Sequence, residues 1–309
     1  MKRIYILFSL IFLFSFLNAQ DIKFTMPYSS PLYLNPAFAG SAGMLRVSGS
    51  YRNQLPNISE NFVSSSVSLD RYIKFIIGGI GINYFNDRQG MGTTTMNRVS
   101  VIYSAHIPLF KNKWVLKPAI EGAYGRNYFD WSKLSFGSPQ YGFVYGDKIK
   151  QIVSYPDFSS GILIYSEKFF GGFAVHHLNE PETSFLYNES NLPQKYTAHA
   201  GANITLRCEK KVMISPSFVY LQQQDFRTLL INLAIQSNVM CASIGYRNGD
   251  NMIASVGFRT KTFRMAYGYD VSVSRLGIVT AGSHEVSLSV FLKRKKVPAG
   301  FLPFETASF

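Results

Sequence analysis

The chain has 309 residues, a formal net charge of +13 at pH 7, and a composition that is 47% hydrophobic and 15% aromatic but only 16% charged. Its two cysteines, Cys208 and Cys241, exclude a disulfide framework, and no Cys or His pattern predicts a bound metal or another cofactor. Aromatic, weakly charged chains without a long apolar run fit a β-barrel whose outer face meets lipid.

The N-terminus predicts a secretory signal peptide over residues 1–19. Lys2 and Arg3 precede an apolar run at residues 4–17, and the small residue Ala19 suits a cleavage site. This run of about 14 residues is shorter than the stretch of about 20 that a transmembrane helix needs. We therefore expect an exported protein. Because an exported protein rarely meets nucleic acid, we do not interpret the positive net charge as a sign of a nucleic-acid partner.

Residues 20–44 precede the first predicted strand, and fourteen segments between residues 45 and 292 then alternate apolar and polar residues. The clearest is residues 196–207, in which every second residue from Tyr196 to Leu206 is apolar. Segments of about 8 to 13 residues with this period predict an all-β fold, a transmembrane antiparallel β-barrel of about 14 strands. The expected strands lie near residues 45–52, 62–70, 75–85, 98–107, 114–124, 158–165, 169–176, 196–207, 212–220, 226–235, 239–246, 252–258, 263–270 and 285–292.

The connections between these segments alternate in length. The long ones near residues 127–157 and 177–194 belong to one set, and every connection in the other set is short. Bacterial barrels have an even number of strands, short periplasmic turns and longer external loops. We therefore predict an outer-membrane barrel with both termini periplasmic. Residues 293–309 would form a basic periplasmic tail, which either extends into the periplasm or tucks into the barrel.

Charged and histidine side chains recur on the polar face of the predicted strands and are candidates to face the lumen. Lys117 and Glu121 lie on the same face of one segment and are candidates for an internal salt bridge. Such groups either fill the barrel by pairing with one another or line a path for a substrate, and we favour pairing. The candidate lumen residues are Arg46, Arg52, Asp70, Arg98, His106, Lys117, Glu121, His199, Arg207, Arg264, Asp270 and Glu285.

Basic residues gather in the short turns and in the tail, whereas most acidic residues fall in the other connections. A basic periplasmic rim can dock an acidic partner by electrostatic complementarity. It can also consist of lysines that reach lipid phosphates at the membrane edge. The candidate docking residues are Lys210, Lys211, Lys261, Lys293, Arg294, Lys295 and Lys296.

No residue pattern indicates catalysis, so we expect that the protein is not an enzyme. Gly78, Gly79 and Gly81 do not form a phosphate-binding loop before a helix, and we interpret them as glycines that allow the barrel to curve. The histidines belong to no nucleophile motif: His106, His176, His177, His199 and His284.

Several segments together resemble the PorP/SprF family of type IX secretion system membrane proteins. Residues 32–41, Leu-Tyr-Leu-Asn-Pro-Ala-Phe-Ala-Gly-Ser, are similar to the most characteristic motif of that family, and Tyr-Arg-Asn-Gln follows at residues 51–54. The chain departs from many members by continuing beyond the last strand. Further similar segments lie at residues 83–90, 107–109, 156–161, 245–247 and 282–285.

The resemblance implies an outer-membrane component of a Bacteroidetes-type bacterium that is associated with type IX secretion. It would assist the secretion or cell-surface anchoring of a partner protein such as a large adhesin, with gliding motility in gliding species. Its partners would be that cargo, periplasmic secretion-system subunits and outer-membrane lipid. The alternative is an outer-membrane channel for small or hydrophobic solutes.

The motif itself is expected to form a structural plug in or beneath the lumen, in preference to contacting cargo. Hydrogen bonds of the Asn35 side chain and a turn at Pro36 would hold the plug in place. The motif residues are Asn35, Pro36, Ala37, Phe38 and Gly40.

Overall fold

The computed structural model describes residues 21–57, 61–133, 151–185, 190–207, 211–249, 251–272, 282–292 and Phe304. The expected signal peptide lies outside the described residues, as does the expected tail at residues 293–309 apart from Phe304.

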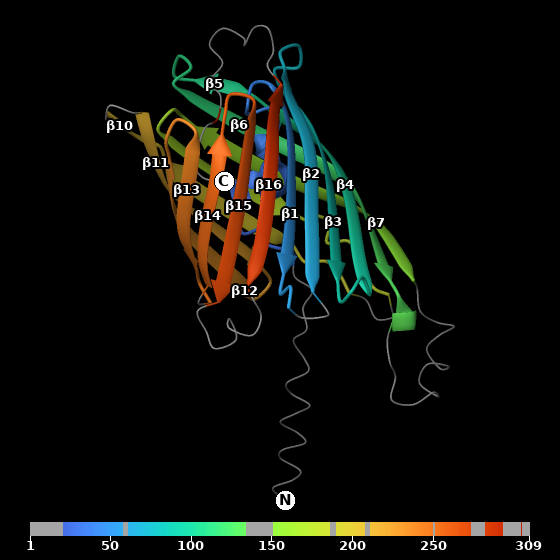
Figure 1. Cartoon of the computed structure of the whole chain (residues 1–309). Helices are drawn as coiled ribbons and strands as arrows, with labels where there is room; N and C mark the ends of the chain where they lie inside the picture. The colour runs from blue at the N-terminus through green and yellow to red at the C-terminus, as the bar shows by residue number, and fades with distance from the viewer. Residues whose placement is uncertain are drawn as a thin grey trace, which may run out of the picture.

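Strands make up nearly all of the described chain, as the period-two alternation predicts (Figure 1). The bounds of the strands are β1 (Leu45–Gln54), β2 (Phe62–Ile73), β3 (Gly78–Gln89), β4 (Thr94–Ala105), β5 (Ile107–Leu109), β6 (Trp114–Phe129), β7 (Ile152–Tyr165), β8 (Phe169–His176), β9 (Lys195–Ala202), β10 (Ile204–Arg207), β11 (Lys211–Gln223), β12 (Phe226–Gln236), β13 (Met240–Arg247), β14 (Asn251–Arg259), β15 (Phe263–Ser272) and β16 (Ser283–Leu292).

The strands close into one antiparallel barrel. β1 pairs with both β2 and β16, so that Leu45 lies opposite Leu292 and Gln54 lies opposite Ser283. β4 and β5 pair in succession with β6, and β9 and β10 pair in succession with β11, so each of these two couples is one interrupted barrel strand. The described residues therefore form a closed barrel of 14 strands, which confirms the predicted fold class and strand count.

The two faces of the barrel differ in chemistry. In β2, Val67 and Leu69 are exposed on the outside, while Ser66, Ser68 and Asp70 are buried on the inside. Side chains of neighbouring strands then meet across the inner face, as Ser48 and Ser289 do with their Oγ atoms 2.9 Å apart. Aromatic residues are exposed outside near both rims, as the girdles of membrane barrels require: Tyr51, Phe75, Phe110, Tyr128, Phe169, Tyr246 and Phe263.

The rims of the barrel differ in their connections. At one rim, which we call the short-turn rim, tight turns join β2 to β3, β7 to β8 and β14 to β15. At the other, the long-loop rim, the chain between β6 and β7 and between β8 and β9 is much longer. β1 begins and β16 ends at the short-turn rim.

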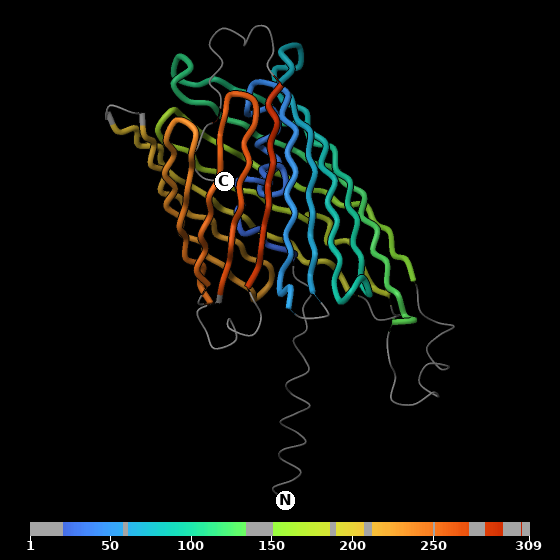
Figure 2. The backbone as a smooth tube through the Cα atoms, viewed as in Figure 1, coloured from blue at the N-terminus to red at the C-terminus, as the bar shows by residue number. Residues whose placement is uncertain are grey.

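The segment before β1 runs inside the barrel. It contains three short helical turns, η1 (Pro27–Ser29), α2 (Pro31–Leu34) and η2 (Pro36–Phe38), each of which begins with a proline. Proline suits the first helical position because the N–H that it lacks would be unpaired there. Figure 2 shows this blue segment within the ring of strands, and we call residues 21–44 the plug.

The plug crosses the lumen from one rim to the other. Asp21 contacts His177 and Lys195 at the long-loop rim, and Gly40 contacts Asp70 next to the short-turn rim. The barrel strands thus start and finish at one rim, as expected, but the described chain begins at the opposite one. The plug thus adds one more crossing of the lumen. Both chain ends lie outside the described residues, so the expectation of periplasmic termini stays a prediction.

Among the residues that the structure describes, no helix is long and apolar enough to cross a membrane.

The outward face of β4 provides a test of its contact with lipid. Val101→Arg places a charge at a central outward position that is 62% exposed, and it should destabilise the protein in lipid vesicles by about 2–4 kcal/mol. Urea unfolding measures this change. Met91→Arg is the control, because Met91 is equally exposed but lies in the β3–β4 turn at the rim. Equal stabilities of the two variants would contradict a lipid-facing outer surface.

Candidate functional site

Asn35 is the centre of the contact between plug and barrel. Its side chain is fully buried, and its Oδ1 accepts a hydrogen bond from the Ala37 backbone N–H at 2.9 Å, which begins η2. Its Nδ2 donates to the carbonyl oxygens of Ile162 in β7 at 3.1 Å and Phe173 in β8 at 3.3 Å. One amide side chain therefore shapes the turn at Pro36 and also attaches it to two strands.

Glycines in the barrel wall leave the space that the motif occupies. A Cβ at Gly161 would lie 2.2 Å from Asn35 Oδ1, and a Cβ at Gly79 would lie 2.1 Å from the carbonyl oxygen of Ala39. A Cβ at Gly81 would lie 2.8 Å from the Leu32 side chain. Close approach of the plug accounts for Gly79 and Gly81, which the sequence analysis interpreted only as sites of barrel curvature.

A buried ion pair holds the end of the plug near the short-turn rim. Arg46 Nε lies 2.8 Å from Asp70 Oδ1, and Asp70 Oδ2 accepts a hydrogen bond from the Gly40 N–H at 2.7 Å. Arg46 also donates to the carbonyl oxygen of Phe38 at 3.1 Å. Gly40 adopts φ +70°, in the region that favours glycine, and this directs its N–H to the carboxylate. Two predicted lumen residues therefore bind the backbone of the motif.

Glu285 binds the extended part of the plug. Its two carboxylate oxygens accept hydrogen bonds from the backbone N–H groups of Thr25 at 2.5 Å and Met26 at 3.3 Å. Glu285 is fully buried on β16. These bonds satisfy backbone donors that an isolated extended segment cannot pair within itself.

Two arginines bind the neighbouring plug carbonyls. Arg52 donates to the carbonyl of Lys23, and Arg247 donates to that of Phe24 at 3.2 Å. Asp270 lies between the two guanidinium groups, 3.4 Å from Arg52 and 2.6 Å from Arg247. Arg52 and Asp270 were among the predicted lumen residues, but Arg247 was not. The sequence marked Arg247 only by its place in the segment at residues 245–247 that resembles the family.

A chain of buried charges crosses the inner wall near the long-loop rim. Arg98 lies 2.6 Å from Glu121 and 2.8 Å from Asp157, and Asp157 lies 3.0 Å from His177 Nδ1. Asp157 was expected in the long loop at residues 127–157. That expectation is wrong, because β7 begins at Ile152 and extends beyond the apolar part of the strand.

The plug supplies the next charge in this chain. Asp21 Oδ2 lies 3.0 Å from His177 Nε2 and 2.5 Å from Lys195 Nζ. Burial alone would raise the pKa of Asp21, but Lys195 and His177 outweigh burial and hold this pKa well below its usual value. Burial likewise opposes protonation of His177, but Asp21 and Asp157 raise its pKa overall. The start of the plug is therefore anchored by charge.

The predicted pair between Lys117 and Glu121 does not form. Glu121 binds Arg98 instead, and Lys117 Nζ donates to the carbonyl oxygen of Ala105 at 3.4 Å. Two residues four positions apart on one strand are separated by about 13 Å, which is too far for a salt bridge. Each of the two side chains instead finds its partner on β4, the strand that pairs with β6.

The other predicted lumen residues occupy several places on the inner face. His199 is buried in β9 and stacks on Phe38 of the plug, with ring centroids 5.3 Å apart. His106 is buried beside Tyr72, with ring centroids 5.3 Å apart, and Arg264 is half-buried on β15. The side chain of Arg207 lies outside the described residues.

The predicted docking residues are mostly not described. Lys261 is exposed in the β14–β15 turn at the short-turn rim. Only the backbone of Lys211 is described, in β11. Lys210 and residues 293–296 lie outside the described residues, so the docking hypothesis stays a prediction.

Phe304, from beyond the last strand, packs on the plug. Its N–H donates to the carbonyl oxygen of Ser41 at 2.9 Å. Its ring centroid lies 5.0 Å from that of Phe38, 5.6 Å from that of Tyr165 and 5.2 Å from that of Phe170. This residue therefore lies in the lumen, which is one of the two positions expected for the tail.

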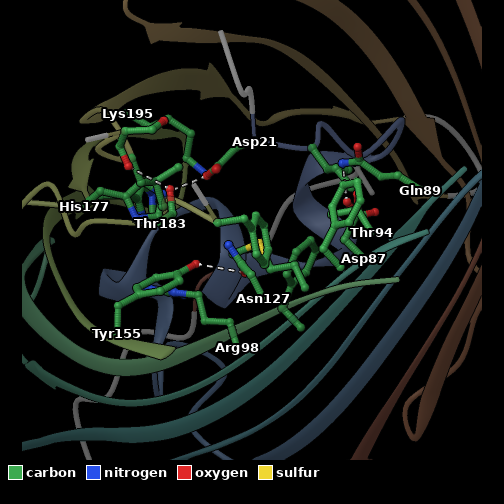
Figure 3. Close-up of a pocket in the computed structure, with 18 of the residues that line it drawn as sticks. Asp21, Asp87, Gln89, Thr94, Arg98, Asn127, Tyr155, His177, Thr183 and Lys195 are labelled. Carbon is green, nitrogen blue, oxygen red and sulfur yellow. Dashed lines mark hydrogen bonds and ion pairs between the residues drawn. The ribbon is translucent and has the colours of Figure 1, made fainter. Parts of the chain in front are cut away.

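A cavity of about 500 Å³ lies between the plug and the long-loop rim (Figure 3). Asp21, Leu32 and Tyr33 contribute to its wall from the plug, and Arg98 and His177 contribute from the chain of charges. Further lining residues are Phe85, Asp87, Gln89, Thr94, Met96, Glu121, Asn127, Phe129, Trp131, Tyr155, Thr183 and Lys195. The cavity is thus aromatic and polar, and it lies on the side of the plug where the long loops gather.

The fold and this site define an outer-membrane β-barrel whose lumen is occupied by its own N-terminal segment. The sequence matches the family described as type IX secretion system membrane protein PorP/SprF over residues 16–290. The chain therefore belongs to that family, as the motif at residues 32–41 predicted, and it has the general role in type IX secretion that the family description states.

Solved structures with a similar fold are outer-membrane proteins of low sequence identity. The Ralstonia pickettii toluene transporter TbuX is 9% identical, with 84% of this chain and 91% of that chain covered and a TM-score of 0.45. The Acinetobacter baumannii outer membrane protein Omp33 is 8% identical, with 81% and 98% covered and a TM-score of 0.42. No curated protein is significantly similar in sequence to this chain.

The glycine contacts generate a test of the plug. Gly161→Ala should displace the motif, because the new Cβ would lie 2.2 Å from Asn35 Oδ1. Hydrogen exchange of the amides in residues 31–40 should become about tenfold faster or more. Gly122→Ala is the matched control, since its Cβ would meet only the Phe158 ring at 4.0 Å. Unchanged exchange in Gly161→Ala would show that the motif does not depend on this close approach.

Proposed function

We propose that this barrel assists the secretion or surface anchoring of a partner protein, such as a large adhesin, and that it does not act as a solute channel or an enzyme. In gliding species this role would extend to gliding motility. The single observation that carries the proposal is the occupied lumen, because a segment held by Glu285, Asp70 and Asn35 obstructs the path that a channel requires.

We further propose that the short-turn rim faces the periplasm and the long-loop rim faces the exterior. Short periplasmic turns and longer external loops are the usual arrangement in bacterial barrels. The partner would then meet the long loops and the cavity beside them, while periplasmic secretion-system subunits would meet the basic short-turn rim.

The anchoring role predicts a stable complex. The tagged protein, extracted from native outer membranes in mild detergent, should co-elute with a large secreted protein or with secretion-system subunits that mass spectrometry identifies. Recovery of a barrel without partners would contradict a stable complex and favour the channel.

The same extraction tests the basic rim. Replacing the four basic residues at 293–296 with glutamine should remove periplasmic subunits from the eluate if these residues dock an acidic partner. Lys133→Gln is the control, since Lys133 is exposed at the long-loop rim. Unchanged recovery would favour the alternative in which these lysines contact lipid.

The channel alternative is tested by conductance in planar bilayers. The whole protein should conduct poorly, and a variant that lacks residues 21–41 should conduct much more, because the plug fills the lumen. High conductance of the whole protein, equal to that of the deletion variant, would support the solute channel.

A further inference from the structure

One carboxylate in the wall of the long-loop cavity has no cationic partner. Asp87 is 4% exposed on the inner face of β3, and it accepts hydrogen bonds from Ser64 Oγ at 3.0 Å and Gln89 Nε2 at 2.7 Å. Within the described ranges no ion pair includes Asp87. A carboxylate in this position retains the capacity to accept further hydrogen bonds.

The other charges around this cavity are already paired. Asp21 binds Lys195 and His177, and Glu121 binds Arg98. The cations that line the cavity are therefore held by other carboxylates, which leaves Asp87 as the acidic group able to receive a cation from outside.

Aromatic rings lie beside this carboxylate. Phe85 is on the same face of β3 as Asp87, two residues away, and it stacks on Tyr33 of the plug with ring centroids 4.8 Å apart and an interplanar angle of 22°. Phe129 and Trp131 also line the cavity and pack together, with ring centroids 4.2 Å apart. Aromatic faces attract cations, and the attraction strengthens where water is excluded.

We propose that the long-loop cavity binds a basic side chain, arginine in preference to lysine, from a peptide segment of the secreted partner. The guanidinium would make charge-assisted hydrogen bonds to Asp87 and pack against the half-buried rings of Phe129 and Trp131 that line the same cavity, a combination that its planar shape allows. The cavity of about 500 Å³ has room for such a side chain with part of its backbone. Figure 3 shows Asp87 and Gln89 together at one side of the cavity, away from Asp21, His177 and Lys195. This inference rests on the proposed function, since it names the chemistry by which a partner is recognised.

The test uses two peptides that differ only in charge. Acetyl-Gly-Arg-Gly-amide and its citrulline counterpart, in which a neutral urea replaces the guanidinium, are titrated into the whole purified protein by calorimetry. The arginine peptide should bind about tenfold or more tightly than the citrulline peptide. Asp87→Asn should abolish most of that difference, and Asp130→Asn should preserve it, because Asp130 is a carboxylate outside the cavity lining that already has Lys133 and Ser132 as partners.

A second variant tests the site independently, in case Asp87→Asn loses binding only because it misfolds. Phe129→Leu keeps an apolar side chain but removes an aromatic ring from the cavity lining, and it should weaken binding of the arginine peptide severalfold while the heat-modifiable gel mobility of the barrel is retained. Equal binding of the two peptides, or arginine binding that is unaffected by Asp87→Asn in a folded barrel, would overturn the inference. Recovery of a secreted partner in the pull-down would then leave the proposed function in place without this site.

Discussion

A barrel of fourteen strands encloses more space than its own inward side chains fill, and the rest of this structure depends on what occupies that space. Interiors of about eight strands are filled by side chains, whereas barrels of about sixteen to eighteen strands leave a water-filled channel. Here the lumen is occupied by the plug, residues 21–44, in which Phe38 is fully buried. Occupation by the protein's own chain distinguishes this barrel from an open pore.

Filling a lumen with irregular chain is costly unless its backbone groups are paired. The three helical turns of the plug are too short to satisfy their own donors and acceptors. The barrel therefore supplies partners from its wall, with Glu285 and Asp70 accepting from plug N–H groups and Arg46 and Arg247 donating to plug carbonyls. Removing any one of these side chains leaves a buried polar group unpaired, which costs about 1–3 kcal/mol.

The charged residues of the inner wall have different roles at the two rims. Near the short-turn rim, Arg46 and Asp70 pair with each other, and Arg46 also binds the backbone of the plug motif. Near the long-loop rim, the chain of charges ends at Asp21, and the adjoining cavity retains a carboxylate and several aromatic rings. The plug thus closes the barrel and also forms the floor of the one cavity in the described residues that we assign a binding role.

The sequence by itself determined the barrel, its strand number and the family, because alternation along a strand and a contiguous motif are local properties. It also indicated which charges face inward, since the side-chain direction follows the same period of two. Only the tertiary structure decided which charges pair: Lys117 and Glu121 share a strand but find partners on neighbouring strands or backbone. The tertiary structure also explains why residue 79 is glycine. The carbonyl oxygen of Ala39, which is distant in the sequence, occupies the space that a Cβ at position 79 would need. Such contacts depend on the register of neighbouring strands and on the path of the plug, and neither is written in the periodicity of any single segment.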